Sequence, residues 1–320
     1  MIGISFILPY YKLDRWMLDR AVDSILQAQL ACDYEIIVVD DGTPGSEARL
    51  WLEGKSDRIR YVWQENGGLS VARNKGISLA TKEYIQFLDP DDYFFSNGLR
   101  QIVAVLDEEH PDVVVFRRHK KVYDDRLLSV KPVRLKKVTY GSGLEYMVCR
   151  SLFAGVWSYA FRRDALGDER FLPGIYHEDE DFTPRLFARS GKMVETNILA
   201  YAYYQRPSSI VNSMNAKSIE KRFEDMFVIL SRLQASEEEA GSALRRAAFH
   251  RRKEQFALSV VYQALRLLPD ESLRRCLDCL ARFGCWPLPS AAYTLRYRLF
   301  RCLTGRRWKL KIMRLLLKRR

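Results

Sequence analysis

The chain has 320 residues, enough for one large domain or for a domain with an appendage. Hydrophobic residues make up 48% of it, which predicts a sizeable core and excludes extensive disorder. The net charge of +12 lies at one end, because residues 279–320 contain 12 basic side chains and no acid. Residues 1–278 carry 40 charges of each sign and are neutral as a whole.

The sequence shows no feature of a membrane-spanning or secreted protein. No apolar run approaches the ~18 to 20 residues that a spanning helix needs. Residues 1–15 lack a basic leader and are predicted to form a first strand rather than a signal peptide. The six cysteines are too sparse for a disulfide scaffold, and the C-x-x-C of Cys276 and Cys279 has no second pair at zinc spacing. A cytoplasmic protein with packing thiols is predicted.

Strand-like and helix-like segments alternate over the first hundred residues. This order predicts a mainly parallel, Rossmann-like α/β sheet flanked by helices, in which ligands bind beyond the carboxyl ends of the strands. The predicted strands are residues 4–8, 34–39, 59–63 and 84–88, and the predicted helices are residues 13–29, 46–51 and 69–79.

The pattern becomes less regular after these elements. Short strands are predicted at 112–116 and 201–205, and the polar residues 120–138 are predicted to form a connection or a hairpin. From Ser218 on, the chain has the pattern of successive helices. We therefore predict an α/β domain over residues 1–215 and a helical C-terminal region over residues 216–320.

The strand predicted at 84–88 runs directly into three carboxylates, Asp89, Asp91 and Asp92. Three acids this close raise one another's pKa unless a cation lies among them, and oxygen ligands suit Mg²⁺ or Mn²⁺. A solvated acidic turn is the alternative. We expect a metal ion here that bridges two phosphates of a sugar nucleotide and stabilises the departing diphosphate.

A second acidic pair, Asp40 and Asp41, ends the strand predicted at 34–39. The pair is either part of a simple turn or an acceptor of hydrogen bonds from a nucleotide base or ribose. Because both acidic clusters follow strands of one parallel sheet, we expect them to converge on one site.

Two weaker patterns add candidate residues. Gly67 and Gly68 precede a predicted helix, which suits a phosphate cradle or a simple turn. Arg73, one turn into that helix, is either a phosphate or ribose partner or a surface arginine. Four consecutive acids begin at Glu178 and suit either an exposed helix start or a general base that takes a proton from an acceptor hydroxyl.

The basic C-terminus is predicted to form an amphipathic helix. Trp308, Ile312, Leu315 and Leu316 share one face, and basic side chains repeat on another. Such a helix suits an anionic membrane surface, a nucleic acid or plain solvent. The membrane is preferred, because nothing else in the chain suits nucleic acid and a solvated helix leaves Trp308 exposed.

Taken together, these residues resemble the family 2 glycosyltransferases of the GT-A fold, especially bacterial enzymes that build surface polysaccharides. The first four of the matching motifs are specific as a set, and the resemblance ends near Ala235. The motifs are residues 5–11, 35–42, 66–74 and 87–92, followed by the looser 178–182 and by 203–206 with 209–210.

The resemblance implies a role for each matched residue. Asp89 and Asp91 look like the family's metal-binding pair, and Asp179 matches the catalytic base of this inverting family, with Glu178 beside it. Lys12 departs from the family, which often has Asn after the tyrosine. The implied contacts to the nucleotide sugar are Pro9, Tyr11, Asp40, Asp41, Arg73, Asp89 and Arg206.

The implied activity is a metal-dependent transfer of a hexosyl group from a nucleotide-diphosphate sugar to a hydroxyl of a glycan or lipid-linked glycan. The basic tail would hold this enzyme at the inner face of the cell membrane as a peripheral protein, and no nucleic acid partner is expected. From the residues alone, two alternatives stay open. One is a nucleotidyltransferase acting on a sugar phosphate, and the other is a non-catalytic basic protein that binds nucleic acid.

Overall fold

The computed structural model of the chain describes residues 2–206, 215–290, 293–305 and 307–318. The chain forms two compact units, each built from several segments. The first unit comprises Met1–Tyr146, Phe153–Gly174 and Arg185–Asn212, and the second comprises Met147–Leu152, Ile175–Pro184 and Ser213–Arg320.

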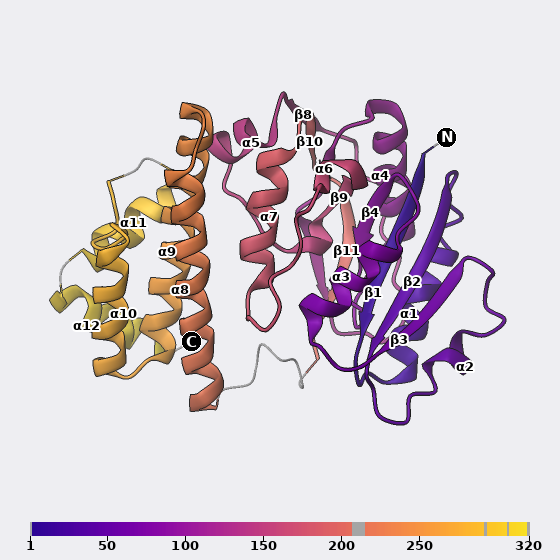
Figure 1. Cartoon of the computed structure of the whole chain (residues 1–320), viewed down its shortest axis with the longest axis horizontal. Helices are drawn as coiled ribbons and strands as arrows, with labels where there is room; N and C mark the ends of the chain where they lie inside the picture. The colour runs from indigo at the N-terminus through magenta and orange to yellow at the C-terminus, as the bar shows by residue number, and fades with distance from the viewer. Residues whose placement is uncertain (1, 207–214, 291–292, 306, 319–320) are drawn as a thin grey trace. The chain divides into compact units, whose positions relative to one another are not determined.

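A large sheet forms the centre of the first unit (Figure 1). In the described part of the chain its strands are β1 (Gly3–Tyr10), β2 (Asp33–Asp41), β3 (Ile59–Gln64), β4 (Tyr84–Phe87), β6 (Val113–Val115), β8 (Lys137–Tyr140), β9 (Tyr159–Arg162) and β10 (Met193–Thr196). Their order is β3-β2-β1-β4-β9-β6-β10-β8. β3, β2, β1 and β4 are parallel neighbours, which confirms the mainly parallel sheet predicted from the sequence. β9 is antiparallel to β4 and β6, and β8 is antiparallel to β10.

A smaller sheet joins β5 (Tyr93–Phe94), β11 (Leu199–Tyr204) and β7 (Arg118–Val122). β11 pairs with β5 in the antiparallel and with β7 in the parallel direction. The polar residues 120–138 connect two sheets and do not form a hairpin, because β7 pairs with β11 whereas β8 pairs with β10.

Helices cover both faces of the parallel strands. α3 (Leu69–Leu79) contacts β1 and β2 on one face. On the other face lie α1 (Arg15–Leu26), α2 (Ala48–Leu52) and α4 (Ser96–Glu109), which share a core with β1 (Figure 1). α3 approaches β1 so closely that a Cβ on Gly76 would lie 2.2 Å from Cγ2 of Ile7. Packing therefore requires glycine at position 76.

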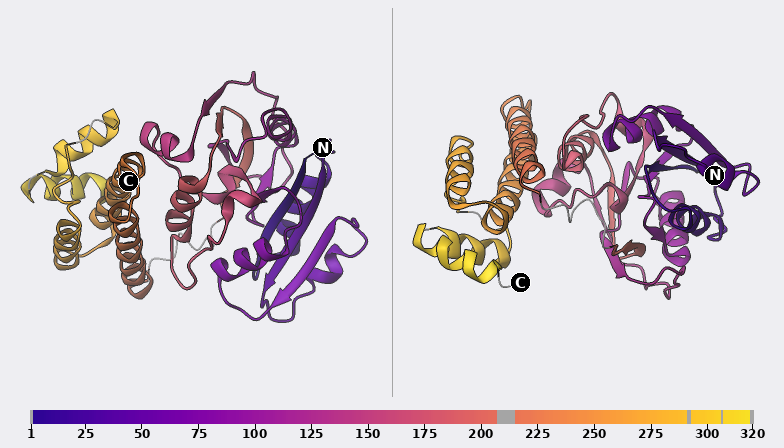
Figure 2. Two further views of the ribbon diagram at one scale, coloured as in Figure 1. Left: turned by 45° about the horizontal axis from the view of Figure 1, so that its top comes forward. Right: turned by 90° about the horizontal axis from the view of Figure 1, so that it is seen from below.

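The second unit consists mainly of α8 (Ala216–Glu238), α9 (Ala243–Leu267), α10 (Asp270–Arg282), α11 (Leu295–Thr304) and α12 (Arg307–Lys318). α8, α10 and α12 each pack against α9 (Figure 2). The side chains of Ser242 and Thr294 cap the starts of α9 and α11 by accepting hydrogen bonds from backbone amides of the first turn. No helix in the described ranges is both long enough and apolar enough to cross a membrane.

The last two helices bury one side and expose apolar residues on another. Leu310 and Met313 of α12 are buried, whereas Ile312 and Leu315 are 49% and 66% exposed. The side chains of Trp308 and Leu316 lie outside the described residues, as do positions 209–210. In α11 the exposed apolar residues follow one stripe of the helix, with spacings of four residues. They are Leu295, Leu299 and Leu303.

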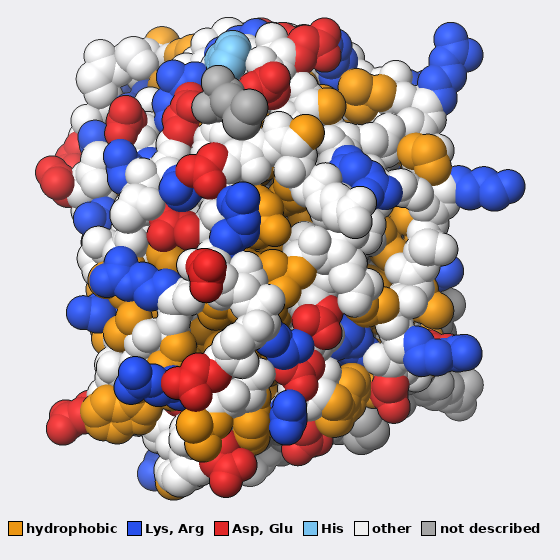
Figure 3. Space-filling model, turned by 90° about the vertical axis from the view of Figure 1, so that its right-hand side faces the viewer, with side chains coloured by type: hydrophobic (Ala, Val, Ile, Leu, Met, Phe, Trp, Pro, Cys, Tyr) orange, Lys and Arg blue, Asp and Glu red, His pale blue; other side chains and the backbone are white. Residues whose placement is uncertain are grey.

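Charges of both signs are intermixed on the face of the molecule seen in Figure 3. Neither sign gathers there into one continuous patch. In the first unit, for example, the carboxylate of Asp33 forms ion pairs with Lys82 at 2.6 Å and with Arg58 at 3.2 Å. This mixture agrees with the neutral balance of residues 1–278.

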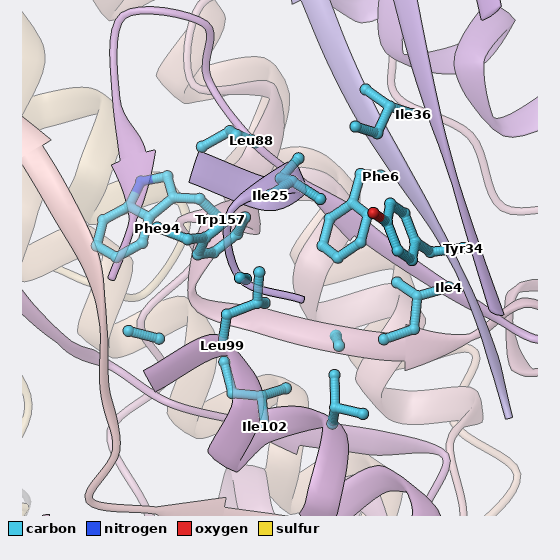
Figure 4. Packing of buried hydrophobic residues seen from close by; sticks show 14 of the residues in the cluster. Ile4, Phe6, Ile25, Tyr34, Ile36, Leu88, Phe94, Leu99, Ile102 and Trp157 are labelled. Carbon is cyan, nitrogen blue, oxygen red and sulfur yellow. The ribbon is translucent and has the colours of Figure 1, made fainter. Parts of the chain in front are cut away.

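The main core lies between the sheet and the helices α1 and α4 (Figure 4). Ile4 and Phe6 of β1 point into it, and the ring of Phe6 lies edge-on to Tyr34 at 6.2 Å and to Phe94 at 6.0 Å. Because Ile7 faces α3 instead, β1 is buried on both faces. This burial holds the carboxyl end of β1 between those of β2 and β4.

Candidate active site

The carboxyl ends of β2, β1 and β4 lie side by side at one edge of the sheet. β1 pairs in the parallel direction with both neighbours, with Tyr10 opposite Asp40 and Ile7 opposite Phe87. The pair Asp40-Asp41 and the acids that follow β4 therefore lie at the same edge, on either side of the end of β1. The fold brings together the two acidic clusters that the sequence placed at strand ends.

Asp40 holds the turn that follows β2. Its side chain is fully buried, and Oδ1 accepts a hydrogen bond from the backbone N–H of Thr43 at 2.9 Å. Oδ2 accepts from the hydroxyl of Tyr61 at 2.8 Å and from the hydroxyl of Ser46. Burial and the hydrogen bond to Asp40 raise the pKa of Tyr61 to about 12, so this hydroxyl stays protonated and remains a donor.

Asp41 shapes the loop between β3 and α3. Its carboxylate accepts from Gln64 Nε2 at 2.7 Å, from Asn66 Nδ2 at 3.2 Å, and from the backbone N–H groups of Gly67 and Gly68 at 2.9 and 2.8 Å. A carboxylate has about four acceptor positions, so the protein itself occupies those of Asp41. The glycine amides, one suggestion for a phosphate cradle, donate to Asp41 in this structure.

Gly42 allows the loops after β2 and β3 to approach each other. Its φ is +76°, and a Cβ at this position would lie 2.6 Å from the backbone nitrogen of Asn66. Only glycine fits both the left-handed conformation and this close approach.

The end of β1 carries Pro9 and the loop residue Tyr11. Pro9 is buried, whereas Tyr11 is 41% exposed, and Nζ of Lys12 lies 4.9 Å from the centre of its ring. The backbone N–H of Lys12 donates to Oγ1 of Thr43 at 3.0 Å. Tyr11 is thus an exposed ring next to the turn that Asp40 holds.

Arginines hold both acids that the sequence proposed as metal ligands. Arg73 Nη2 donates to Asp89 Oδ1 at 3.1 Å, and Arg73 itself is 4% exposed, with Phe171 and Phe87 beside its guanidinium. Arg206 Nε lies 2.8 Å from Asp91 Oδ2. The matched arginines are therefore partners of the acids, and Arg73 is not a surface residue.

The electrostatics of this cluster oppose ionisation of its inner acids. Burial, followed by the charge of Asp89, raises the pKa of Asp91. Burial and the charges of Asp91 and Asp89 raise the pKa of Asp92 well above its usual value. Asp92 is 2% exposed and accepts from the backbone N–H of Tyr204 at 2.7 Å, so it ties the acidic segment to β11.

Arg20 of α1 is a buried support of the acidic segment that the sequence analysis did not identify. Its Nη2 donates to the backbone oxygen of Asp91 at 2.6 Å, and its guanidinium lies 4.4 to 4.9 Å from the rings of Trp16, Tyr93 and Tyr204. Burial lowers the pKa of Arg20. An arginine within the buried face of an amphipathic helix was the available signal.

Glu178 and Asp179 lie in the second unit, whereas the acids at the strand ends lie in the first. They form the first turn of α7 (Glu178–Arg189). Oδ1 of Asp179 accepts from the backbone N–H of Glu180 at 2.9 Å. The next acid, Asp181, is 1% exposed and accepts from Arg232 Nε of α8 at 2.8 Å.

Asp89 and Asp91 suit a hard divalent ion by their chemistry. Mg²⁺ is commonly held by one or two carboxylates, with water and phosphate oxygens completing its shell. A cation would also offset the burial and repulsion that raise the pKa of Asp91. Among the residues with a described position, no group of three His, Cys, Asp or Glu side chains is placed to hold an ion. Phosphate oxygens of a bound ligand and water would have to supply further ligands of the ion.

The parallel sheet with acids at the carboxyl ends of β2 and β4 defines the class of α/β proteins that bind their ligands beyond the strand ends. The profile of "Glycosyl transferase family 2" matches residues 5–167, which is 163 of the 320 residues. The chain belongs to this family.

Curated relatives extend the match beyond that segment. The "Uncharacterized glycosyltransferase EpsJ" of Bacillus subtilis (strain 168) is 30% identical over 216 residues, covering 65% of this chain and 62% of that protein. The "Uncharacterized glycosyltransferase YibD" of Escherichia coli (strain K12) is 24% identical over 283 residues, covering 83% and 80%. The chain thus spans four fifths of the length of YibD but less than two thirds of the length of EpsJ.

A solved structure has the same fold. S. aureus TarS 1-349, crystallised in complex with UDP-GlcNAc, superposes with a TM-score of 0.67 at 19% identity, covering 99% of this chain and 91% of that one. The GT-A type α/β fold with a helical C-terminal region, predicted from the sequence, is confirmed.

Proposed function

We propose that this protein is an inverting glycosyltransferase that moves a sugar from a nucleotide-diphosphate donor to a hydroxyl of a glycan during cell-surface polysaccharide synthesis. The observation that carries this proposal is the pair of arginine-held acids at the carboxyl edge of the sheet, Asp89 with Arg73 and Asp91 with Arg206. Family membership supplies the reaction class. The UDP-GlcNAc complex of TarS supports a nucleotide sugar as the donor.

Asp89 and Asp91 are proposed to hold Mg²⁺ or Mn²⁺ against the donor diphosphate. When bound, such an ion stabilises the charge that builds on the leaving diphosphate. Arg206 is proposed to exchange its contact with Asp91 for a diphosphate oxygen, since a guanidinium pairs with phosphate as it does with carboxylate. Arg73 would keep the carboxylate of Asp89 in place.

Pro9, Tyr11, Asp40 and Asp41 are proposed to form the nucleotide side of the site. The exposed ring of Tyr11 is suited to stacking against a base. Asp40 and Asp41 already accept several hydrogen bonds from the protein. Their main contribution is therefore to fix the two loops that would enclose the base.

Asp179 is proposed to remove the proton from the acceptor hydroxyl, with Glu178 beside it. The hydroxyl oxygen would attack the anomeric carbon as the bond to the diphosphate breaks, and attack from the opposite face inverts that centre. Asp179→Asn should abolish transfer while donor binding survives. Full activity in this variant would remove the assignment of the base.

A glycan or lipid-linked glycan is the proposed acceptor, and an anionic membrane surface is the proposed docking site of the C-terminal region. The support is the concentration of 12 basic residues without an acid in residues 279–320, together with the exposed stripe of Leu295, Leu299 and Leu303. This arrangement would make the protein peripheral at the inner face of the cell membrane.

The direct test is a screen of UDP-, GDP- and dTDP-sugars for release of the nucleoside diphosphate, with Mg²⁺ or Mn²⁺ and with EDTA. We expect turnover of one donor class that EDTA removes. Release of pyrophosphate from a nucleoside triphosphate and a sugar phosphate would instead support a nucleotidyltransferase. Salt-sensitive DNA binding without any turnover would support the nucleic-acid alternative.

A further inference from the structure

The acidic start of α7 is a cluster of like charges that needs compensation. Glu178, Asp179, Glu180 and Asp181 are consecutive, and none of the four side chains is exposed. Adjacent carboxylates in a partly dry environment repel one another and favour protonation. Besides the start of the helix, cations from other elements that face the segment would offset this repulsion.

The charged groups that face this segment come from two helices of the same unit. α8 supplies Arg222 and Asp225, which lie near His177, and Asp225 Oδ2 accepts from the backbone N–H of Tyr176 at 2.9 Å. α8 also supplies Arg232, which donates to Asp181. α9 supplies Arg252.

Arg252 is the deepest of these cations. Its side chain is 5% exposed, and its Nη2 contacts Oε2 of Glu180. Burial lowers the pKa of Arg252 to about 10, and the charge of Asp179 acts in the opposite direction. Arg252 therefore stays a cation at neutral pH, contacts Glu180 and interacts electrostatically with Asp179.

Arg232 restrains the far end of the same turn. Its Nε lies 2.8 Å from Oδ1 of Asp181, whose side chain is 1% exposed. The two arginines thus contact two successive acids of one helical turn, Arg232 from α8 and Arg252 from α9. Both helices lie beyond residues 5–167, the part of the chain that the family profile covers.

We propose that Arg252 and Arg232 are positioning residues that clamp the acidic turn through Glu180 and Asp181, so that Asp179 is held in one orientation for proton removal. This inference rests on the proposed role of Asp179 as the base. It makes α8 and α9 part of the catalytic apparatus. A guanidinium suits the task, because it keeps its charge when buried and its planar fork holds a carboxylate in a fixed geometry.

The first test measures stability and needs no substrate. The melting temperature of the full chain is followed from about pH 4 to pH 8, across the ordinary carboxyl pKa range, for the wild type and for Arg252→Met. Arg251→Met is the matched control, because Arg251 is the next residue of α9 and its guanidinium lies 4.5 Å from the ring of Tyr293. We expect the deficit of Arg252→Met to grow as pH rises and the carboxylates ionise. A deficit that is constant with pH, as in the control, would overturn the proposal.

A charge-balanced variant covers the case in which Arg252→Met does not fold. Glu180→Gln combined with Arg252→Met removes both members of the buried pair, and it is compared with Glu180→Gln alone. The pH-dependent deficit should persist in part, because the double variant also removes the charge interaction of Arg252 with Asp179, and it should disappear when Asp179→Asn is added. Its absence in the double variant would refute an electrostatic interaction between Arg252 and Asp179.

The second test measures catalysis, with hydrolysis of UDP-GlcNAc in Mn²⁺ as the probe reaction. Arg252→Lys should lower kcat by about 10²-fold and leave KM nearly unchanged, because a displaced base costs rate rather than donor affinity. In Glu180→Gln with Arg252→Met, the acid limb of the rate profile should move to higher pH. Suppose that Asp179→Asn is inactive, whereas Arg252→Lys and the double variant Glu180→Gln with Arg252→Met keep the wild-type kcat and pH profile. The proposed clamp is then wrong, and the proposed function survives. Full activity of Asp179→Asn rejects the base itself.

Discussion

Asp91 is a carboxyl group whose surroundings disfavour its charged form. Burial and the charge of Asp89 raise its pKa, and Arg206 acts in the opposite direction. A carboxylate kept in this position by several contacts, including that of Arg20 to its backbone oxygen, is suited to binding a cation. We therefore expect the Asp91 carboxylate to contribute to ligand binding rather than to the stability of the free protein.

Asp91→Asn should remove the stabilisation that Mn²⁺ adds in the presence of UDP. The amide carries no charge to hold the ion, so the rise in melting temperature with Mn²⁺ should vanish. The measurement is thermal unfolding with UDP, with and without Mn²⁺. Asp33→Asn, which changes an ion-paired acid at the opposite end of β2, should respond like the wild type. An undiminished Mn²⁺ effect in Asp91→Asn would contradict the metal assignment.

His177 should make the protein less stable in mild acid. Burial lowers its pKa below the ordinary value of 6.5, so the unfolded chain binds a proton more readily than the folded one. The contribution of this group to stability is therefore complete above about pH 6.5 and is lost as pH falls towards the folded pKa.

His177→Asn should flatten this pH dependence, because asparagine stays neutral and also accepts the φ of 62° found at this position. The fall in melting temperature between about pH 7 and pH 5, the interval that spans the ordinary histidine pKa, is the quantity to compare. The control is His110→Asn, at an exposed residue with a φ of 44° at the end of α4. An equal fall in wild type and His177→Asn would contradict the prediction.

At the scale of the elements, the parallel strands of the first unit agree with the alternation of strand-like and helix-like segments over the first hundred residues. β1 and β4 carry apolar side chains on both faces, because both strands are buried on both faces. The antiparallel direction of β9 and the assignment of β7 and β8 to different sheets had no local signal. Strand partners depend on contacts between distant residues, which the local pattern does not encode.

Gly76→Ala tests the contact between α3 and β1. Helix propensity alone favours alanine, but its Cβ would meet Ile7 at 2.2 Å, a contact with a core side chain of the central strand. We expect a loss of about 1–3 kcal/mol in the free energy of unfolding, the usual cost of overpacking. Denaturant unfolding measures it. Gly241→Ala, where a Cβ meets nothing within 4 Å, should cost far less, and a stabilised Gly76→Ala would contradict the packing argument.

At the scale of the whole molecule, the excess positive charge belongs to the end of the helical unit. α12 buries Leu310 and Met313, so its inner side is occupied by the protein. The leucine stripe of α11 is exposed and lies in a segment without acids. The structure therefore adds α11 to the surface proposed to meet the membrane.

Leu299→Glu with Leu303→Glu should release the protein from vesicles that contain anionic lipid. The change removes two apolar side chains from the docking surface and adds two negative charges that anionic lipid repels. Cosedimentation with vesicles of anionic and of neutral lipid measures it. Val228→Glu, at a 42% exposed residue of α8, is the control. Unchanged cosedimentation of the double variant would refute docking through α11.

The division into residues 1–215 and 216–320 remains a prediction about domains. The compact units interleave, since residues 147–152 and 175–184 group with the C-terminal helices. The acidic turn at Glu178 is thus built with helices that follow it by dozens of residues. Arg252, for example, contacts Glu180 from α9.

The sequence by itself determined the strands and helices of the parallel half, the acids at their carboxyl ends, and the basic end of the chain. Each of these depends on residues that are neighbours along the chain, where periodicity and charge can be read directly. Only the tertiary structure decided which cation holds which acid, because those pairs join residues far apart. Arg20 reaches Asp91 across 71 positions, and Arg232 reaches Asp181 across 51. Such pairs depend on how buried charges are compensated when the elements pack.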